Sequence, residues 1–115
     1  MDRRIFHIKK ELSQSLNRPW SVEQMAKEVS LSISGLQQLF KKEIGVSPMS
    51  YLQSMRMDKA YDLLSENHSF LRIKEIAYTV GYQDLSHFSR DFKRFTGLAP
   101  TEFREHCSEK EQIED

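Results

Sequence analysis

The chain has 115 residues, of which 38% are apolar and 30% are charged, so it is long enough for one domain with a buried core. Its apolar runs are far too short to span a membrane, its N-terminus lacks a signal-peptide core, and its single cysteine excludes an internal disulfide and fits a reducing cytoplasm. The net charge is zero, but residues 105–115 have a net charge of −4 and the rest of the chain +4, which is compatible with a DNA partner.

The spacing of apolar residues predicts an all-α fold. A first helix is expected over residues 4–17, where Ile5, Ile8, Leu12 and Leu16 form one apolar stripe. Ser21 is expected to cap a second helix, with Gln24 completing a capping box. Further helices are expected at residues 33–43, about 48–66, 73–80, 85–95 and 100 to about 106, with a loop at 67–70 and an acidic, disordered tail at 108–115.

Two segments of the chain, residues 20–52 and 71–104, have nearly the same pattern. With an offset of 51 residues, the first segment matches the second at Val22/Ile73, Met25/Ile76, Ala26/Ala77 and Val29/Val80. One extra residue then enters the second segment, and an offset of 52 gives the matches Leu36/Phe88, Phe40/Phe92, Lys41/Lys93, Gly45/Gly97, Pro48/Pro100 and Tyr51/Phe103. Each segment predicts two helices joined by a short turn, with a small alanine where the helices approach, which is the helix-turn-helix pattern.

The helix expected between the two segments would be roughly 28 Å long at 1.5 Å per residue. One turn of DNA rises about 34 Å. Two recognition helices on such a connector could therefore enter adjacent major grooves on one face of a duplex, with no need for a dimer.

The motifs of the second segment resemble the DNA-binding domain of the AraC/XylS transcription regulators. The residues that carry the resemblance are I-x-x-I-A-x-x-V-G-Y at 73–82, F-S-R-D-F-K at 88–93 and G-L-A-P-x-x-F-R at 97–104, and it covers about residues 5–106. It implies seven helices in a domain at residues 1–107, with one helix-turn-helix unit at about 5–47, a long central helix at about 48–66 and a second unit at about 70–107. It also implies a bacterial regulator, often an activator, with RNA polymerase as a partner and a sensor domain upstream.

Helical geometry identifies the candidate DNA contacts. The core residues of helices 33–43 and 85–95 leave two outward stripes, whose members are the candidate base contacts Ser34, Gln37 and Gln38 in the first helix and Ser86, Ser89 and Arg90 in the second. Arginine pairs bidentately with guanine and glutamine with adenine. The candidate phosphate contacts, which set affinity rather than sequence, are Lys41, Lys42, Lys93 and Arg94.

Other polar and aromatic residues have simpler interpretations. His87 lies beside the second stripe and is either a DNA contact or a partly exposed surface histidine. Asp84 is expected to cap the second recognition helix. Four phenylalanines are expected to lie in the core rather than to stack on DNA bases: Phe88, Phe92, Phe95 and Phe103. His106 and Cys107 lack metal-ligand spacing with His7 or His68, so neither a metal nor a cofactor is expected.

Two positions depart from the family pattern. The family often has arginine where Gln38 stands and a longer polar residue where Gly35 stands. Glycine inside a helix costs roughly 0.8–1 kcal/mol relative to alanine. We therefore expect the first helix-turn-helix unit to bind DNA more weakly, or to prefer a more A·T-rich half-site, than the second.

Two other functional classes are alternatives to DNA binding. A helical protein-interaction module is favoured by the zero net charge and the acidic tail. An enzyme is not expected, because the sequence has no paired-carboxylate pocket, no glycine-rich phosphate loop and no nucleophile with a positioned base. The predicted first helix begins almost at Met1, so the chain is either a complete small regulator or, as we expect, the C-terminal domain of a longer one.

Overall fold

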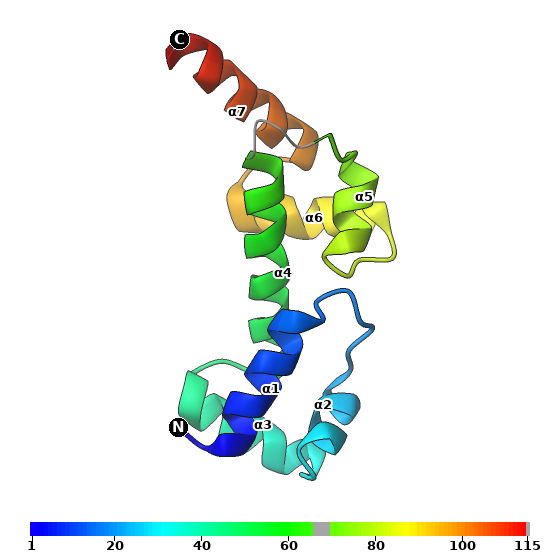
Figure 1. Cartoon of the computed structure of the whole chain (residues 1–115), viewed down its shortest axis with the longest axis vertical. Helices are drawn as coiled ribbons and strands as arrows, with labels where there is room; N and C mark the ends of the chain where they lie inside the picture. The colour runs from blue at the N-terminus through cyan, green and yellow to red at the C-terminus, as the bar shows by residue number, and fades with distance from the viewer. Residues whose placement is uncertain (66–69, 115) are drawn as a thin grey trace. The chain divides into compact units, whose positions relative to one another are not determined.

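The computed structural model has seven α-helices and no strand in the residues that it describes, which are 1–65 and 70–114, with side chains described as far as residue 108 (Figure 1). The helices are α1 (Arg3–Gln14), α2 (Val22–Glu28), α3 (Ile33–Ile44), α4 (Pro48–Ser65), α5 (Ile73–Thr79), α6 (Leu85–Thr96) and α7 (Pro100–Glu114). The predicted all-α class and the order of the helices are confirmed. The predicted loop at 67–70 lies outside the described residues apart from Phe70.

Two helices differ in length from the prediction. Helix α1 ends at Gln14 rather than near residue 17, because the backbone leaves the helix at Ser15. Helix α7 begins at Pro100 as expected but continues to Glu114, past the predicted end near His106. Residues 101–114 contain no glycine or proline and are rich in glutamate, which favours helix. Most of the expected disordered tail, 108–115, is therefore helical, and residue 115 lies outside the described residues.

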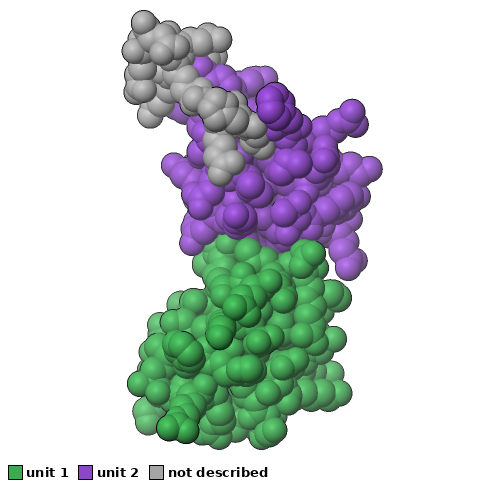
Figure 2. Space-filling view, viewed as in Figure 1, with its two compact units in different colours: residues 1–55 green, residues 56–115 purple. Residues whose placement is uncertain are grey.

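The chain divides into two compact units, the first unit at residues 1–55 and the second unit at residues 56–115 (Figure 2). The boundary falls inside α4, so this helix contributes residues to both units. Leu52 belongs to the core of the first unit, whereas Met57, Ala60 and Leu64 belong to the core of the second. Among the described helices, none combines the length and apolar character that a bilayer crossing requires.

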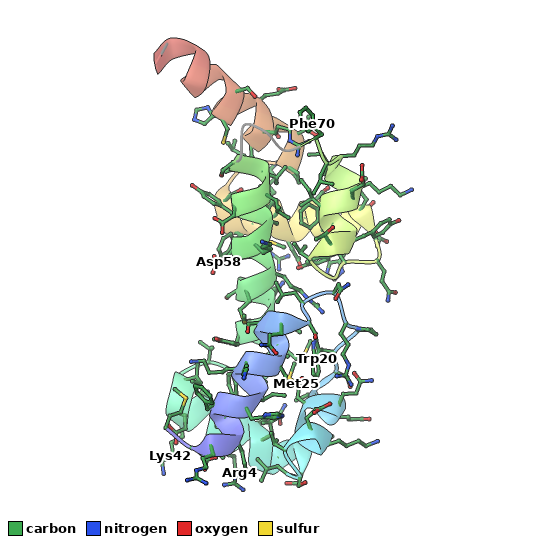
Figure 3. All side chains as sticks on the ribbon, in the orientation of Figure 1. Arg4, Trp20, Met25, Lys42, Asp58 and Phe70 are labelled. Carbon is green, nitrogen blue, oxygen red and sulfur yellow. The ribbon has the colours of Figure 1, made fainter. Side chains whose placement is uncertain are left out.

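The core of the first unit is built from α1, α2, α3 and the start of α4. The apolar stripe of α1 is buried at Ile5, Ile8 and Leu12, while Leu16, beyond the helix end, is only partly buried. Trp20 and Met25, labelled in Figure 3, are buried in the same cluster. The indole of Trp20 donates to the backbone oxygen of Ser15 at 2.9 Å, which satisfies its polar atom.

The core of the second unit is dominated by aromatic rings. Phe88 and Phe92 are completely buried, and their ring centroids are 5.8 Å apart. Phe103 from α7 packs edge-on against Phe92 with centroids 5.3 Å apart. Three of the four predicted core phenylalanines are therefore confirmed.

The prediction that Phe95 lies in the core is wrong, because 48% of this residue is exposed. Ile33 and Leu85, the first residues of α3 and α6, are also exposed at 39% and 41%. All three residues lie at helix ends. Periodicity identifies the inward face of a helix, but a residue at the end of the helix lacks neighbouring elements to cover it.

The turns of the two helix-turn-helix motifs are built alike. In the first unit the backbone N–H of Leu31 donates to the carbonyl of Ala26 at 3.0 Å, and in the second unit that of Tyr82 donates to Ala77 at 2.9 Å. The residue before each donor has a positive φ, 56° at Ser30 and 104° at Gly81. The equivalence at an offset of 51 therefore continues to Tyr82, and Gln83 is the extra residue of the second motif.

Each recognition helix also ends in the same way. Gly45 and Gly97 are left-handed, with φ of 97° and 89°, and their N–H groups donate to the carbonyls of Lys41 and Lys93. A glycine in this conformation donates to a carbonyl at the helix end, and it does so without the steric strain that a Cβ would cause. It fixes the last turn, where the predicted phosphate-binding lysines lie.

Candidate nucleic-acid interface

Helix α3 has a polar outward face. Leu36 and Phe40 are completely buried and anchor the opposite side, so the predicted contacts of this helix are all exposed: Ser34, Gln37, Gln38, Lys41 and Lys42. The amide of Gln38 donates to the hydroxyl of Ser34 over 3.5 Å, one turn earlier. This hydrogen bond is at the long limit and is therefore weak.

Helix α6 has the matching face in the second unit. Ser86, Arg90, Lys93 and Arg94 are exposed as expected, whereas Ser89 is only half-exposed. Ser89 therefore has less surface for DNA than its neighbours. The structure brings the predicted residues of each stripe together on one helix face.

Both recognition helices have a fixed N-terminus. The hydroxyl of Ser32 accepts the N–H of Gly35 at 2.9 Å in α3, and the carboxylate of Asp84 accepts the N–H of His87 at 3.1 Å in α6. The prediction of Asp84 as the cap is confirmed. A cap of this kind stabilises a helix by about 1 kcal/mol and sets where the first side chains point.

A buried carboxylate, Asp91, stabilises one edge of α6. Only 6% of its side chain is exposed, and it accepts a hydrogen bond from the hydroxyl of Tyr82 at 2.8 Å. Nε2 of His87 lies 3.3 Å from the same carboxylate oxygen, and a guanidinium nitrogen of Arg94 lies 4.0 Å from the other. Two of the predicted DNA contacts are therefore held by one acid that packs against the turn.

A half-buried arginine, Arg56, lies near Tyr82. Burial lowers the pKa of the Arg56 guanidinium, while the nearby Tyr82 favours its charged form. The ring of Tyr82 also packs edge-on against that of His87, with centroids 5.2 Å apart. Tyr82 thus connects α4, the turn and the recognition helix within the second unit.

In the first unit, Arg4 of α1 lies beside the recognition helix. Arg4 and Lys42, both labelled in Figure 3, line one open depression of about 300 Å³ that also includes Gly35 and Gln38. Arg4 pairs with Asp2 at 3.1 Å; its hydrogen bonds lower the pKa of Asp2 to about 2, and Asp2 raises that of Arg4. The depression is therefore rich in donors, although one acid offsets part of its charge.

Potential metal ligands do not cluster in the part of the chain that the structure describes, where no group of three or more comes together. His106 is exposed and Cys107 is a free, half-buried thiol beside the core of the second unit. His68 lies outside the described residues.

Comparison with known proteins identifies the family. A family model described as "Helix-turn-helix domain" matches residues 25–106. The chain is 35% identical over 111 residues to the Arabinose operon regulatory protein of Escherichia coli (strain K12), covering 96% of this chain and 37% of that protein. It is 40% identical over 88 residues to the Lactose operon transcription activator of Staphylococcus xylosus, covering 76% of this chain and 31% of the relative.

The chain belongs to the AraC/XylS family. Among solved structures, the C-terminal domain of AraT, a response regulator from Geobacillus stearothermophilus, matches with a TM-score of 0.85 at 28% identity, covering 91% of this chain and 86% of that one. The predicted resemblance is confirmed, and with it a sequence-specific DNA-binding transcription regulator rather than an enzyme. The chain spans about a third of the length of the two curated relatives named above.

Within this AraC-type fold, sequence reasoning missed three residues beside the recognition helices. Asp91 lies four residues after His87 and three before Arg94, a helical spacing that favours ion pairs and was available in the sequence. Tyr82 and Arg4 approach their helices from other elements, so no local spacing identifies them. The structure also gives a reason for a glycine at position 35, because a Cβ there would lie 2.9 Å from the capping hydroxyl of Ser32.

Proposed function

We propose that each unit inserts its recognition helix, α3 or α6, into a major groove, and that the two grooves are adjacent on one duplex. The observation that supports this proposal most strongly is the repetition of the same outward stripe on both helices, each with a cap at its start and a glycine at its end. Because α4 contributes residues to both units, no linker separates the two units along the chain.

The proposed base contacts are those of the two stripes: Ser34, Gln37, Gln38, Ser86, Ser89 and Arg90. Arg90 supplies a planar fork for guanine, and the two glutamines supply amides for adenine. The proposed phosphate contacts are Lys41, Lys42, Lys93 and Arg94, near the ends of the helices. The second unit is the more selective of the two, since only α6 has an arginine in the middle of its stripe.

At the level of the whole protein, we propose a bacterial transcription activator that works in the cytoplasm. Two relatives support this: one is named a transcription activator, and the matched part covers only about a third of each. The proposal includes a sensor domain outside the chain and contact with RNA polymerase at the promoter. In this proposal, this chain is the domain that selects the DNA site.

Binding of the chain to a fluorescent duplex over a series of salt concentrations tests DNA binding itself. Replacing Lys93 with glutamine should weaken binding to all sequences alike and reduce the salt slope by about one unit. Charge reversal at Arg90 and Lys93 should abolish binding. Affinity without salt dependence, or binding that survives charge reversal, would instead favour a protein-interaction module.

The proposed difference between the units has its own test. We expect Arg90→Ala to reduce specific binding more than the double change Gln37→Ala and Gln38→Ala. The reverse order would refute the stronger role of the second unit.

A further inference from the structure

His87 lies at the edge of the outward stripe of α6 rather than in its centre. It follows Ser86 by one residue, which turns it by about 100° around the helix. Arg94 lies two turns further on, along the same edge. Side chains at the edges of a helix in a groove face the phosphate backbones that form its walls, whereas the centre faces the bases.

One nitrogen of the His87 ring is already engaged. Nε2 lies 3.3 Å from the carboxylate oxygen of Asp91 to which Tyr82 also donates. Asp91 is nearly buried, while 58% of the His87 side chain is exposed. A carboxylate favours a protonated nitrogen beside it, so we assign the proton of the neutral ring to Nε2, which leaves Nδ1 for a ligand.

A DNA phosphate offers only acceptor oxygens, and neutral Nδ1 has no proton to donate. The contact therefore requires the imidazolium form, in which both nitrogens have a proton. A phosphate beside Nδ1 stabilises that charge in the complex.

We propose that Asp91 is a positioning residue for DNA binding: its carboxylate, 3.3 Å from Nε2 of His87, orients the ring so that Nδ1 takes up a proton from solvent and donates a hydrogen bond to a DNA phosphate. The inference rests on the proposed function, because it requires α6 to enter a major groove. DNA affinity then increases as the pH falls through the range in which histidine changes its charge.

The charged and titratable groups around His87 come from three elements. Asp91 lies beside Nε2, and Asp84 accepts the backbone N–H of His87 at the helix start. Arg94, on the other oxygen of Asp91, opposes a second positive charge. Tyr82 of the turn packs on the His87 ring, and Arg56 of α4 faces Tyr82.

The test is DNA affinity as a function of pH. Fluorescence anisotropy would be measured with a labelled duplex selected from a random library, between about pH 6 and pH 8 at constant ionic strength. Uptake of one proton limits the change to about tenfold per pH unit, and we expect roughly three- to tenfold for the wild type. His87→Gln and Asp91→Asn should both reduce that slope, while His7→Gln, a matched change on the exposed face of α1, should retain it.

Ring ¹⁵N chemical shifts of His87 provide a measurement that a purely structural role would not change. We expect a proton on Nε2 in the free protein and on both nitrogens in the complex. Asp91→Asn retains the size of the side chain; should that variant fail to fold, His87→Gln and the ring shifts still decide the question.

Equal pH slopes in the wild type and His87→Gln, or a neutral His87 ring in the complex, would overturn this inference while salt-dependent binding persisted. Failure of the wild type to bind the duplex at any pH would overturn the proposed function and this inference with it.

Discussion

Replacing Arg90 with lysine keeps the positive charge of α6 but removes the planar fork that pairs with guanine. Arg90 is exposed and makes no ion pair in the described part of the chain, so the substitution should leave the folded free protein unchanged. Its cost should appear only in the complex. Loss of a bidentate pair reduces discrimination by about 1–3 kcal/mol, which corresponds to roughly 5- to 150-fold in relative affinity.

The assay is competition between the selected duplex and duplexes that each differ from it by one base pair, at one fixed salt concentration. Arg90→Lys should lose discrimination at a single position and keep the salt slope of the wild type. Arg94→Lys is the matched control, since it makes the same change one turn later, where a phosphate requires only the charge. Unchanged base preference in Arg90→Lys, or an equal loss in Arg94→Lys, would refute the assignment of Arg90 to a guanine.

Three further predictions concern stability, and urea unfolding followed by circular dichroism checks each of them. Phe88→Ala removes a completely buried ring from the core of the second unit and should cost about 3–5 kcal/mol. Gly97→Ala should cost about 1–2 kcal/mol, because φ is 89° and a Cβ there would meet nothing within 4 Å, so only the backbone conformation opposes it. Gly35→Ala should change stability little, because its helix propensity gain of about 1 kcal/mol is offset by disturbance of the Ser32 cap, 2.9 Å from the new Cβ. A stabilisation by the full propensity gain would show that the cap adapts freely.

Sequence alone was sufficient for the fold because its strongest signals are local and occur twice. Each of these signals predicts one helix or one turn: the paired alanines, the glycines at the helix ends and the apolar spacing. Because the pattern occurs twice, the prediction for one copy supports the prediction for the other. The end of α7 was missed since no residue there stops a helix, and composition had suggested disorder. Phe95 was misplaced since burial at a helix end depends on which elements lie beside it.

The candidate interface was predictable to the same extent. The outward stripes follow from the helical period, so they required no knowledge of tertiary structure. The pairing of Asp91 with Tyr82 joins a recognition helix to a turn through side-chain packing. No periodicity encodes such a contact, and the role of His87 therefore became definable only from the structure.

The central claim is that one scaffold occurs twice in the chain with unequal DNA-contacting residues, so that a single copy of the chain binds an asymmetric site. Selection of bound duplexes from a random library, followed by a stoichiometry measurement on the enriched site, tests this claim most directly. We predict one non-palindromic site with two half-sites, a guanine requirement in one half that disappears with Arg90→Ala, and one chain per duplex. Enrichment of an inverted repeat bound by two chains, or the same enriched sequence with Arg90→Ala, would contradict it.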